Sequence, residues 1–245
     1  MRLNLLIIAL LPFTAVSQFY MLGDSQRMED GCIMLTPDYP FSEGLAYYQD
    51  KLDLTEYFQI EFDLFFGDND VGADGIAFVI QNDMRQFNAF GSWGECLGYG
   101  RMNPYYPGNS IDPSIAIEFD TYQNYRQNDP ASDHVAFLQN GVSLHETYWN
   151  DQNEDFNLED GKLHSFYFRW NPGKKEVKVF LDGNEVYSGK HDLVKDIFKG
   201  QTKVIWGFTA STGGQHNLQF FCLKRFAQLL NHSQSPMSEL AINYE

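Results

Sequence analysis

Hydrophobic and polar residues alternate along several short segments of this chain. Between Phe58 and Phe66 every second residue is apolar, and most of the side chains between them are polar. This period of two predicts a strand with one buried face and one wetter face. The same alternation runs through residues 176–181, where Asp182-Gly183 turns the chain into a second run of this kind. An Asp-Gly pair between two such runs is a strong hairpin signal.

Other segments are apolar almost throughout. Residues 75–81 and 114–119 are continuous apolar runs, as expected of strands that line the core between two packed sheets. Residues 203–209 and 217–223 predict the closing strands, and residues 192–199 predict one or two helical turns. Many short strands with turn signals between them, and neither heptads nor repeats, predict an all-β sandwich or jelly roll.

The first residues have the pattern of a secretory signal peptide. Arg2 precedes an apolar run that ends at Val16, and small residues up to Ser17 offer a cleavage site. The run is shorter than the roughly 20 residues that a membrane-spanning helix needs, and no later stretch is long and apolar enough. We therefore expect residues 1–17 to be removed and the mature chain to be secreted, without insertion into a membrane.

The rest of the chain predicts one domain and a short tail. Residues 18–226 carry the β pattern and are long enough to enclose one well-buried core. Residues 227–245 are mostly polar and predict a C-terminal tail.

The charge of the chain excludes some classes of partner. The formal net charge is −16, and it becomes −17 on cleavage because Arg2 leaves and no acid does. Nucleic-acid binding needs Lys and Arg to neutralise phosphates, so we expect no nucleic-acid partner. A strong negative charge favours solubility. A strongly negative formal charge also results when carboxylates that bind cations in the folded protein are counted as free.

The densest group of candidate ligands lies at the end of the second apolar run. Glu118 and Asp120 share one face of the expected strand, because side chains two residues apart point the same way. Asp129 returns across a short loop, and three carboxylates repel one another unless a cation lies between them. Oxygen ligands suit Ca²⁺, and an added imidazole, here that of His134, suits a transition ion such as Mn²⁺. Judged from the carboxylates alone, the alternative to a metal site is an acidic turn that is exposed to solvent and binds no ion.

The order of these residues resembles the metal loop of the legume-type (L-type) lectins, the family of concanavalin A-like domains. That family has Glu-x-Asp-x-Tyr/Phe-x-Asn, then Asp-Pro, then His, and residues 118–134 reproduce each element in order. The resemblance implies a jelly-roll β-sandwich of two antiparallel sheets with two adjacent ions. The implied ligands of the transition ion, manganese, are Glu118, Asp120, Asp129 and His134. Those implied for calcium are Asp120, Asn124, Asp129 and the main-chain carbonyl of Tyr122.

Other segments resemble the sugar-binding parts of the same family. Ala73-Asp74-Gly75 resembles the start of a strand at which the Asp accepts from a sugar hydroxyl and follows a cis bond. Residues 91–98 resemble the glycine loop whose backbone N–H faces the sugar, and residues 206–215 resemble the run that opens the specificity loop. In the glycine loop we favour Gly94 over two neighbouring glycines. The resemblance thus implies carbohydrate contacts at Asp74, Gly94, Tyr122, Asn124 and Gln215.

Three cysteines remain after cleavage, so at most one internal disulfide can form, from three pairings. The first and last strands are neighbours in the resembled family, which implies a Cys32–Cys222 pair and leaves Cys96 as a free thiol. The residues alone also allow all three to be buried and reduced.

These expectations lead to a secreted, calcium-dependent carbohydrate-binding protein without catalysis, a lectin that recognises glycans and gains strength as a homo-oligomer. A jelly-roll glycoside hydrolase is the first alternative. It needs Glu-x-Asp-x-x-Glu with the two carboxyls about 5 Å apart, but Gln123 occupies the position of the acid. The second alternative is a protein-adhesion or structural module whose ions serve the fold alone.

Overall fold

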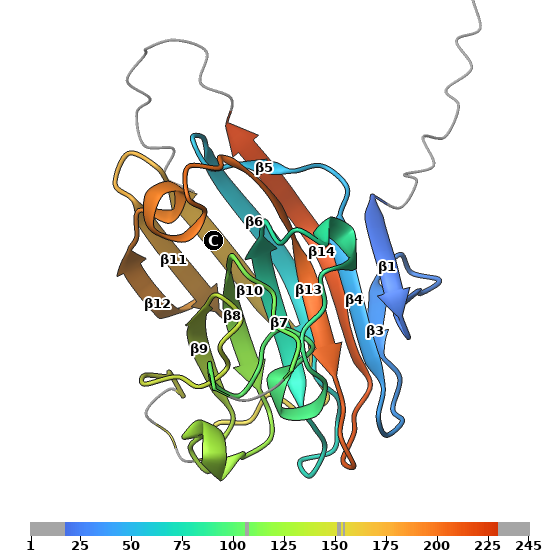
Figure 1. The fold of residues 1–245 in the computed structure, drawn as a ribbon. Coiled ribbons are helices and arrows are strands. Elements are labelled where there is room, and N and C mark those ends of the chain that lie inside the picture. The colour runs from blue at the N-terminus through green and yellow to red at the C-terminus, as the bar shows by residue number, and fades with distance from the viewer. Residues whose placement is uncertain (1–17, 106–107, 151–152, 154, 230–245) are drawn as a thin grey trace, which may run out of the picture.

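The computed structural model describes residues 18–105, 108–150, 153 and 155–229, which form two antiparallel sheets packed face to face (Figure 1). The predicted signal peptide and residues 230–245 of the predicted tail lie outside the described residues. The front sheet has the order β1-β4-β13-β7-β8-β9, and β5 pairs with β13. Its strands are Phe19–Gly23, Glu43–Tyr48, Lys203–Ser211, Gly75–Gln81, Ser114–Asp120 and His134–Gln139, with Leu52–Asp53 as β5.

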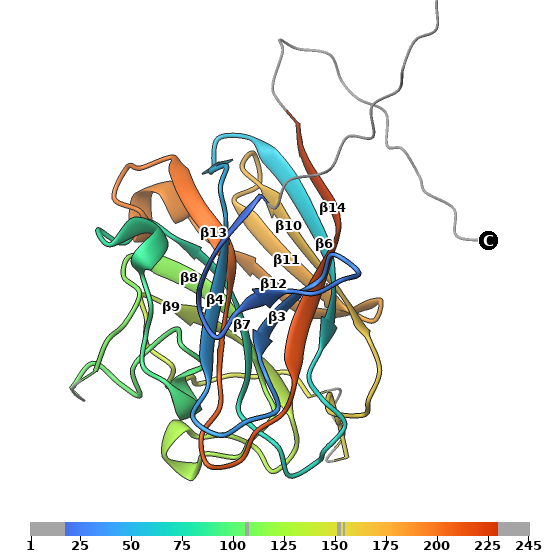
Figure 2. The same cartoon turned by 90° about the vertical axis from the view of Figure 1, so that its right-hand side faces the viewer.

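The back sheet has the order β12-β11-β10-β6-β14-β3-β2. Its strands are Asn184–Lys190, Glu176–Leu181, His164–Asn171, Tyr57–Phe65, Gln219–Leu229, Ile33–Thr36 and Gln26–Arg27. Figure 2 shows the two layers from the side. Short helical turns lie at Gln86–Asn88, Gly94–Cys96, Tyr125–Gln127 and Leu193–Ile197, the last within the segment predicted to be helical. The predicted all-β jelly-roll sandwich is confirmed, and no helix among the described residues is long and apolar enough to cross a membrane.

Aromatic side chains fill the space between the sheets. Burial alternates along β6 as the sequence predicts, and Phe62 points from it into the core. Its ring meets Phe208 of β13 edge-on at 4.7 Å, and Phe208 stacks on Phe221 of β14 at 4.3 Å. Burying one such side chain contributes about 1.5–3 kcal/mol to folding, so these rings hold the two layers together.

The strands β7 and β8 are buried along their whole length, because both of their faces are covered. A sandwich core would bury only every second residue, such as Ile76 and Phe78, on the inner face. The outer-facing Ala77 and Val79 belong to a separate apolar cluster that also contains Leu97 of the segment 82–112. This segment therefore covers the outer face of the front sheet, and the covering explains why the apolar runs are continuous.

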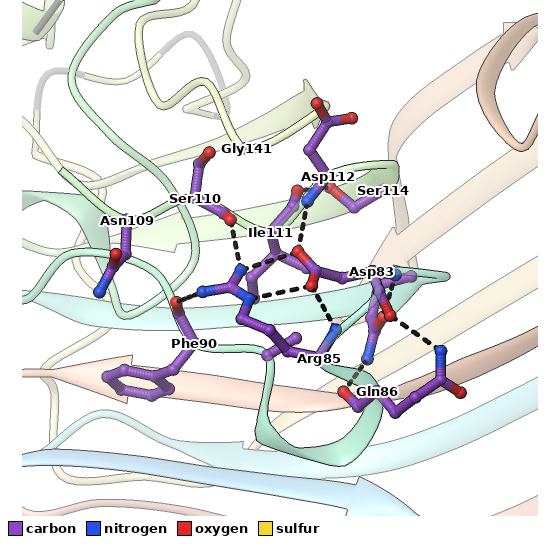
Figure 3. A network of polar contacts seen from close by, with 12 residues as sticks. Asp83, Arg85, Gln86, Phe90, Asn109, Ser110, Ile111, Asp112, Ser114 and Gly141 are labelled. Atoms are coloured by element: carbon purple, nitrogen blue, oxygen red, sulfur yellow. Dashed lines mark hydrogen bonds and ion pairs between the residues drawn. The ribbon is translucent and has the colours of Figure 1, made fainter. Parts of the chain in front are cut away.

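An ion pair fastens the covering segment (Figure 3). The Arg85 guanidinium donates to the buried Asp83 carboxylate at 2.7 and 2.9 Å. It also donates to the main-chain carbonyl of Phe90 at 2.9 Å and to that of Ser110. The Asp112 N–H completes the group by donating to Asp83 at 3.1 Å. One arginine thus joins the beginning, the middle and the end of the segment.

A disulfide joins Cys32 to Cys222, with the Cα atoms 4.3 Å apart, which confirms the implied pairing. The antiparallel β3–β14 register explains this pairing, because Ile33 lies opposite Phe221 and the adjacent Cys32 and Cys222 therefore face each other. Cys96 is a buried free thiol. The last strand, β14, continues to Leu229, past the predicted end of the domain at residue 226. It does so because its backbone pairs with β6, and this ladder is independent of side-chain polarity.

Candidate functional site

Strand register brings the candidate ligands to one edge of the front sheet. Asp120 ends β8 and lies opposite Gly75, the first residue of β7, on one side. On the other side it lies opposite His134, the first residue of β9. Glu118 is two residues earlier on the same face of β8. The side chains of Glu118, Asp120 and His134 are all buried.

Asp74 enters this edge through a cis peptide bond after Ala73, as the resemblance implies. Its main-chain N–H donates to Ser211 at 3.2 Å, and its carbonyl accepts from the Thr121 N–H at 3.0 Å. The next residue, Gly75, has φ +134°, and a Cβ there would lie 2.1 Å from the Phe119 carbonyl oxygen. Only glycine fits this close approach. The Asp74 carboxylate is thereby held in place, with Oδ2 buried and without a hydrogen-bond partner.

The loop after β8 is folded by two of the candidate ligands. Asp120 Oδ1 accepts from the Tyr122 N–H at 2.8 Å, and Asp129 Oδ2 accepts from the Asn124 N–H at 2.7 Å. These bonds use one oxygen of each carboxylate. Asp129 Oδ1 and Asn124 Oδ1 remain buried and without a partner, and such atoms are costly in a folded protein unless a ligand satisfies them.

An open cleft of about 890 Å³ lies over this edge. All five residues predicted to contact carbohydrate line it, although they come from four separate segments of the chain. Its described lining comprises Ala73, Asp74, Ser92, Trp93, Gly94, Glu95, Cys96, Arg101, Met102, Gly108, Tyr122, Asn124, Arg126, Gly213, Gly214 and Gln215.

Among the glycines of the 91–98 loop, Gly94 has the position expected of the sugar-facing residue. A Cβ on Gly94 would lie 4.0 Å from Asp74 Oδ2, so its backbone borders that carboxylate. Gly91 and Gly98 pack inside the loop, against its own backbone and against the Phe90 ring.

The rim of the cleft is partly aromatic. Tyr122 is 39% exposed, and Gln215 is also exposed. Trp93 is 59% exposed and lies edge-on to Phe41, with 5.9 Å between the ring centroids. Sequence reasoning did not single out Trp93 or Phe41, because neither ring differs in pattern from those that fill the core.

His145 is a second residue that sequence reasoning missed. It follows β9 in an irregular segment, and its imidazole is buried against Glu118, with Nδ1 3.4 Å from Oε2. Its neighbours on the chain are tied to another loop, because the Ser143 N–H donates to the Arg101 carbonyl at 3.0 Å. No spacing in the sequence relates His145 to the other ligands, since this long-range contact brings it to them.

Burial and mutual repulsion shift the titration of these groups. Burial raises the pKa of Asp74 to about 7, with the charge of Glu95 adding to the effect. Burial also raises the pKa of Asp129 to about 7, with Glu118 adding to it. The pKa of Asp120 lies well above its usual value because burial and the two nearby carboxylates oppose its charge. These carboxylates are fully ionised at neutral pH only when a cation neutralises them.

The donor set fits divalent cations. Glu118, His134 and His145 offer ligand atoms within 4.8 Å of one another, and so do Asp120, Asp129 and His134. Burial, with His145 adding to it, lowers the pKa of His134 to about 3, so its imidazole is neutral and able to ligate. Carboxylate and amide oxygens suit calcium, and carboxylates combined with imidazole suit a transition ion.

Comparison with known proteins agrees with this geometry. A family model described as the legume lectin beta-barrel domain matches residues 14–225. Over 154 residues the chain is 33% identical to the probable inactive L-type lectin-domain containing receptor kinase III.1 of Arabidopsis thaliana. That match covers 57% of this chain and 23% of the relative, so the chain spans less than a quarter of the length of that protein.

Solved structures share the fold. The lectin of Bauhinia forficata in complex with GalNAc superposes with a TM-score of 0.68 at 21% identity, covering 89% of this chain and 95% of that one. Basic winged bean lectin with Tn-antigen gives a TM-score of 0.67 at 21% identity, covering 85% and 91%. Because the family model matches most of the chain, this protein belongs to the legume-type (L-type) lectin family.

Proposed function

We propose that this lectin domain binds glycans in its cleft through a calcium-organised site, without catalysis, and that it acts outside the cell. The observation that carries the proposal is a pair of buried oxygens without partners, Asp74 Oδ2 and Asn124 Oδ1, on two residues that line one cleft. Each buried polar atom without a partner costs about 1–3 kcal/mol of folding free energy, so a fold keeps two of them in one cleft at a high cost unless a ligand satisfies them.

The residues that would hold calcium are Asp120, Asn124, Asp129 and the main-chain carbonyl of Tyr122. Hydrogen bonds to main-chain N–H groups already orient the two carboxylates of this set. Calcium would neutralise them and fix the Asn124 amide, with Oδ1 toward the ion and Nδ2 free to donate to a sugar hydroxyl. A transition ion would be held next to it by Glu118, Asp120, Asp129 and His134.

The sugar contacts follow from the chemistry of the cleft. Asp74 would accept from hydroxyl groups, and the Gly94 backbone would donate where a side chain would obstruct the approach. Tyr122 would offer an apolar surface to the ring face of the sugar. A site built on hydrogen bonds rejects epimers that leave its groups unpaired. An open cleft still gives weak single-site affinity, because water competes for each hydrogen bond.

Binding without hydrolysis is favoured by the residue at the position of the acid. Gln123 cannot donate the proton that a leaving sugar needs, and its amide lies 3.5 Å from the main-chain carbonyl of Asp129. Glu118, the first carboxylate of the hydrolase pattern, is buried beside the imidazole of His145 instead of lining the cleft.

Export is supported by the Cys32–Cys222 disulfide, because such bonds persist in oxidising compartments. N-terminal sequencing of the protein recovered from culture medium should begin at Gln18. Retention of the full chain inside the cell would contradict secretion.

The test of function is binding to a glycan array that includes galactose and GalNAc termini, with calcium and with a chelator. We expect binding only with calcium, and its loss in Asp74→Ala and Asn124→Ala. Asp50→Ala, in an exposed bend, and Asn184→Ala, at the exposed start of β12, lie outside the cleft; they are the matched controls and should bind like the parent.

Two other outcomes would count against the proposal. Binding that persists with the chelator would assign the acidic loop a different role. A protein that calcium stabilises, but that binds no glycan, would favour a protein-adhesion or structural module.

A further inference from the structure

Four buried atoms without hydrogen-bond partners converge beside the calcium loop. They are Glu118 Oε2, Asp129 Oδ1, His134 Nε2 and His145 Nε2. Each belongs to a buried side chain, and the imidazole of His145 is 2% exposed. A buried polar atom that lacks a partner is rare in native proteins, and four in one place indicate a shared ligand.

The distances between these groups are those of ligands around one ion. His134 Nε2 lies 3.9 Å from Asp129 Oδ1, and His145 Nε2 lies 4.0 Å from the same oxygen. The two imidazole rings are 4.8 Å apart, centroid to centroid, and inclined by 41°. Atoms that are each about 2.1 Å from one metal ion lie about 3 to 4 Å from one another. The second imidazole is therefore close enough to share an ion with the first.

The main chain orients His145 for this role. Its Nδ1 lies 3.4 Å from the carbonyl oxygen of Ser143 and 3.4 Å from Glu118 Oε2, so two acceptors face this nitrogen. The tautomer that carries its proton on Nδ1 suits both acceptors and leaves the Nε2 lone pair free. Metal-bound histidines commonly donate their other N–H to a carbonyl in this manner. The backbone just before His145 is held as well, because Ser143 and Leu144 donate to the main-chain carbonyls of Arg101 and Met102.

We propose that His145 is a direct ligand of the transition ion, together with His134 and the three carboxylates, and that it increases the preference of the site for Zn²⁺ over Mn²⁺. This deepens the proposed function and rests on it for the presence of a transition ion beside calcium. A second nitrogen donor favours ions late in the first transition series, since imidazole suits zinc and oxygen donors suit manganese.

Metal titration of the full-length, sugar-free protein after chelation tests the proposal. In His145→Ala and His145→Asn we expect the Zn²⁺ affinity to fall by at least about 10- to 100-fold, the loss typical of a residue that only supports a ligand, and the Mn²⁺ affinity to fall by less than about 3-fold. His216→Ala is the matched control. It removes a partly exposed imidazole paired with Asp38, and both affinities should equal those of the parent. Equal losses for the two ions would refute the preference, and no loss for either would refute ligation by His145.

A spectroscopic measurement on the parent protein does not depend on how the variants fold. Pulsed electron paramagnetic resonance of the protein with one equivalent of Cu²⁺ should count two imidazole nitrogens in the parent and one in His145→Asn. A single nitrogen in the parent would overturn the proposal. Because no sugar is present, two nitrogens in a protein that binds no glycan would refute the proposed function while leaving this inference intact.

Discussion

Replacing Arg85 by Met should destabilise the fold and loosen the cleft, although Arg85 itself lies outside it. The substitution keeps an unbranched apolar stem and removes four side-chain hydrogen bonds, two to Asp83 and one each to the carbonyls of Phe90 and Ser110. Breaking a buried ion pair costs about 3–5 kcal/mol. The Arg85 side chain is 34% exposed, so water replaces part of the loss, and we expect about 2–3 kcal/mol at neutral pH.

The pH dependence of this cost identifies its origin. Hydrogen bonds from Arg85 offset the burial of the Asp83 carboxyl and hold its pKa below the usual value. A carboxyl with a lowered pKa stabilises the fold above its unfolded-state pKa of about 4, and this stability is lost as the pH falls through its folded-state pKa. The deficit of Arg85→Met should therefore shrink below about pH 4, where Asp83 becomes protonated.

Urea unfolding of the disulfide-bonded protein, in chelator, at pH values from 7 to 3 measures both effects. Arg27→Met, on the exposed edge strand β2, is the matched control and should change the free energy of unfolding by less than about 0.5 kcal/mol. An Arg85→Met variant as stable as the parent at pH 7, or a deficit that grows on acidification, would refute the reasoning.

Three further predictions concern the site and its support. Gly75→Ala should cost more than about 2 kcal/mol and abolish glycan binding, because its Cβ would meet the Phe119 carbonyl oxygen at 2.1 Å; a melting curve like that of the parent would contradict this. Replacing Cys32 and Cys222 by Ser should lower stability by about 2–5 kcal/mol in chemical denaturation, and an unchanged midpoint would show that the bond is dispensable. In chelator, the free energy of unfolding should fall as the pH rises from 5 to 7, because the pKa of Asp129 is raised to about 7 and the folded protein binds its proton more tightly. Added calcium should remove that slope, and a slope of the opposite sign would contradict the assignment.

The sequence predicts the parts of this molecule that depend on local pattern. The bounds of β7 are those of its apolar run, and the alternation after Phe58 gives β6 to within a residue at each end. The candidate ligands from Glu118 to His134 lie on two adjacent strands and one short loop, so their spacing along the chain fixes their spacing in space.

The parts that depend on long-range contacts could not be predicted. His145 reaches the ligands only because an irregular segment pairs with the distant residues Arg101 and Met102. The role of Arg85 depends on three carbonyl and carboxylate partners that no periodicity links. The sequence also does not predict that residues 82–112 cover the outer face of the front sheet, because an apolar run does not reveal whether one or both faces of its strand are buried.

The cleft is assembled from segments around residues 74, 94, 122 and 215, which meet only when strands far apart in the sequence have paired in the front sheet. No short peptide or single hairpin of this chain contains the site, so the short fragments produced by proteolysis should not bind sugar. Glycan binding is therefore a sensor of native structure, and retention on a sugar column can sort correctly folded molecules from misfolded ones during purification.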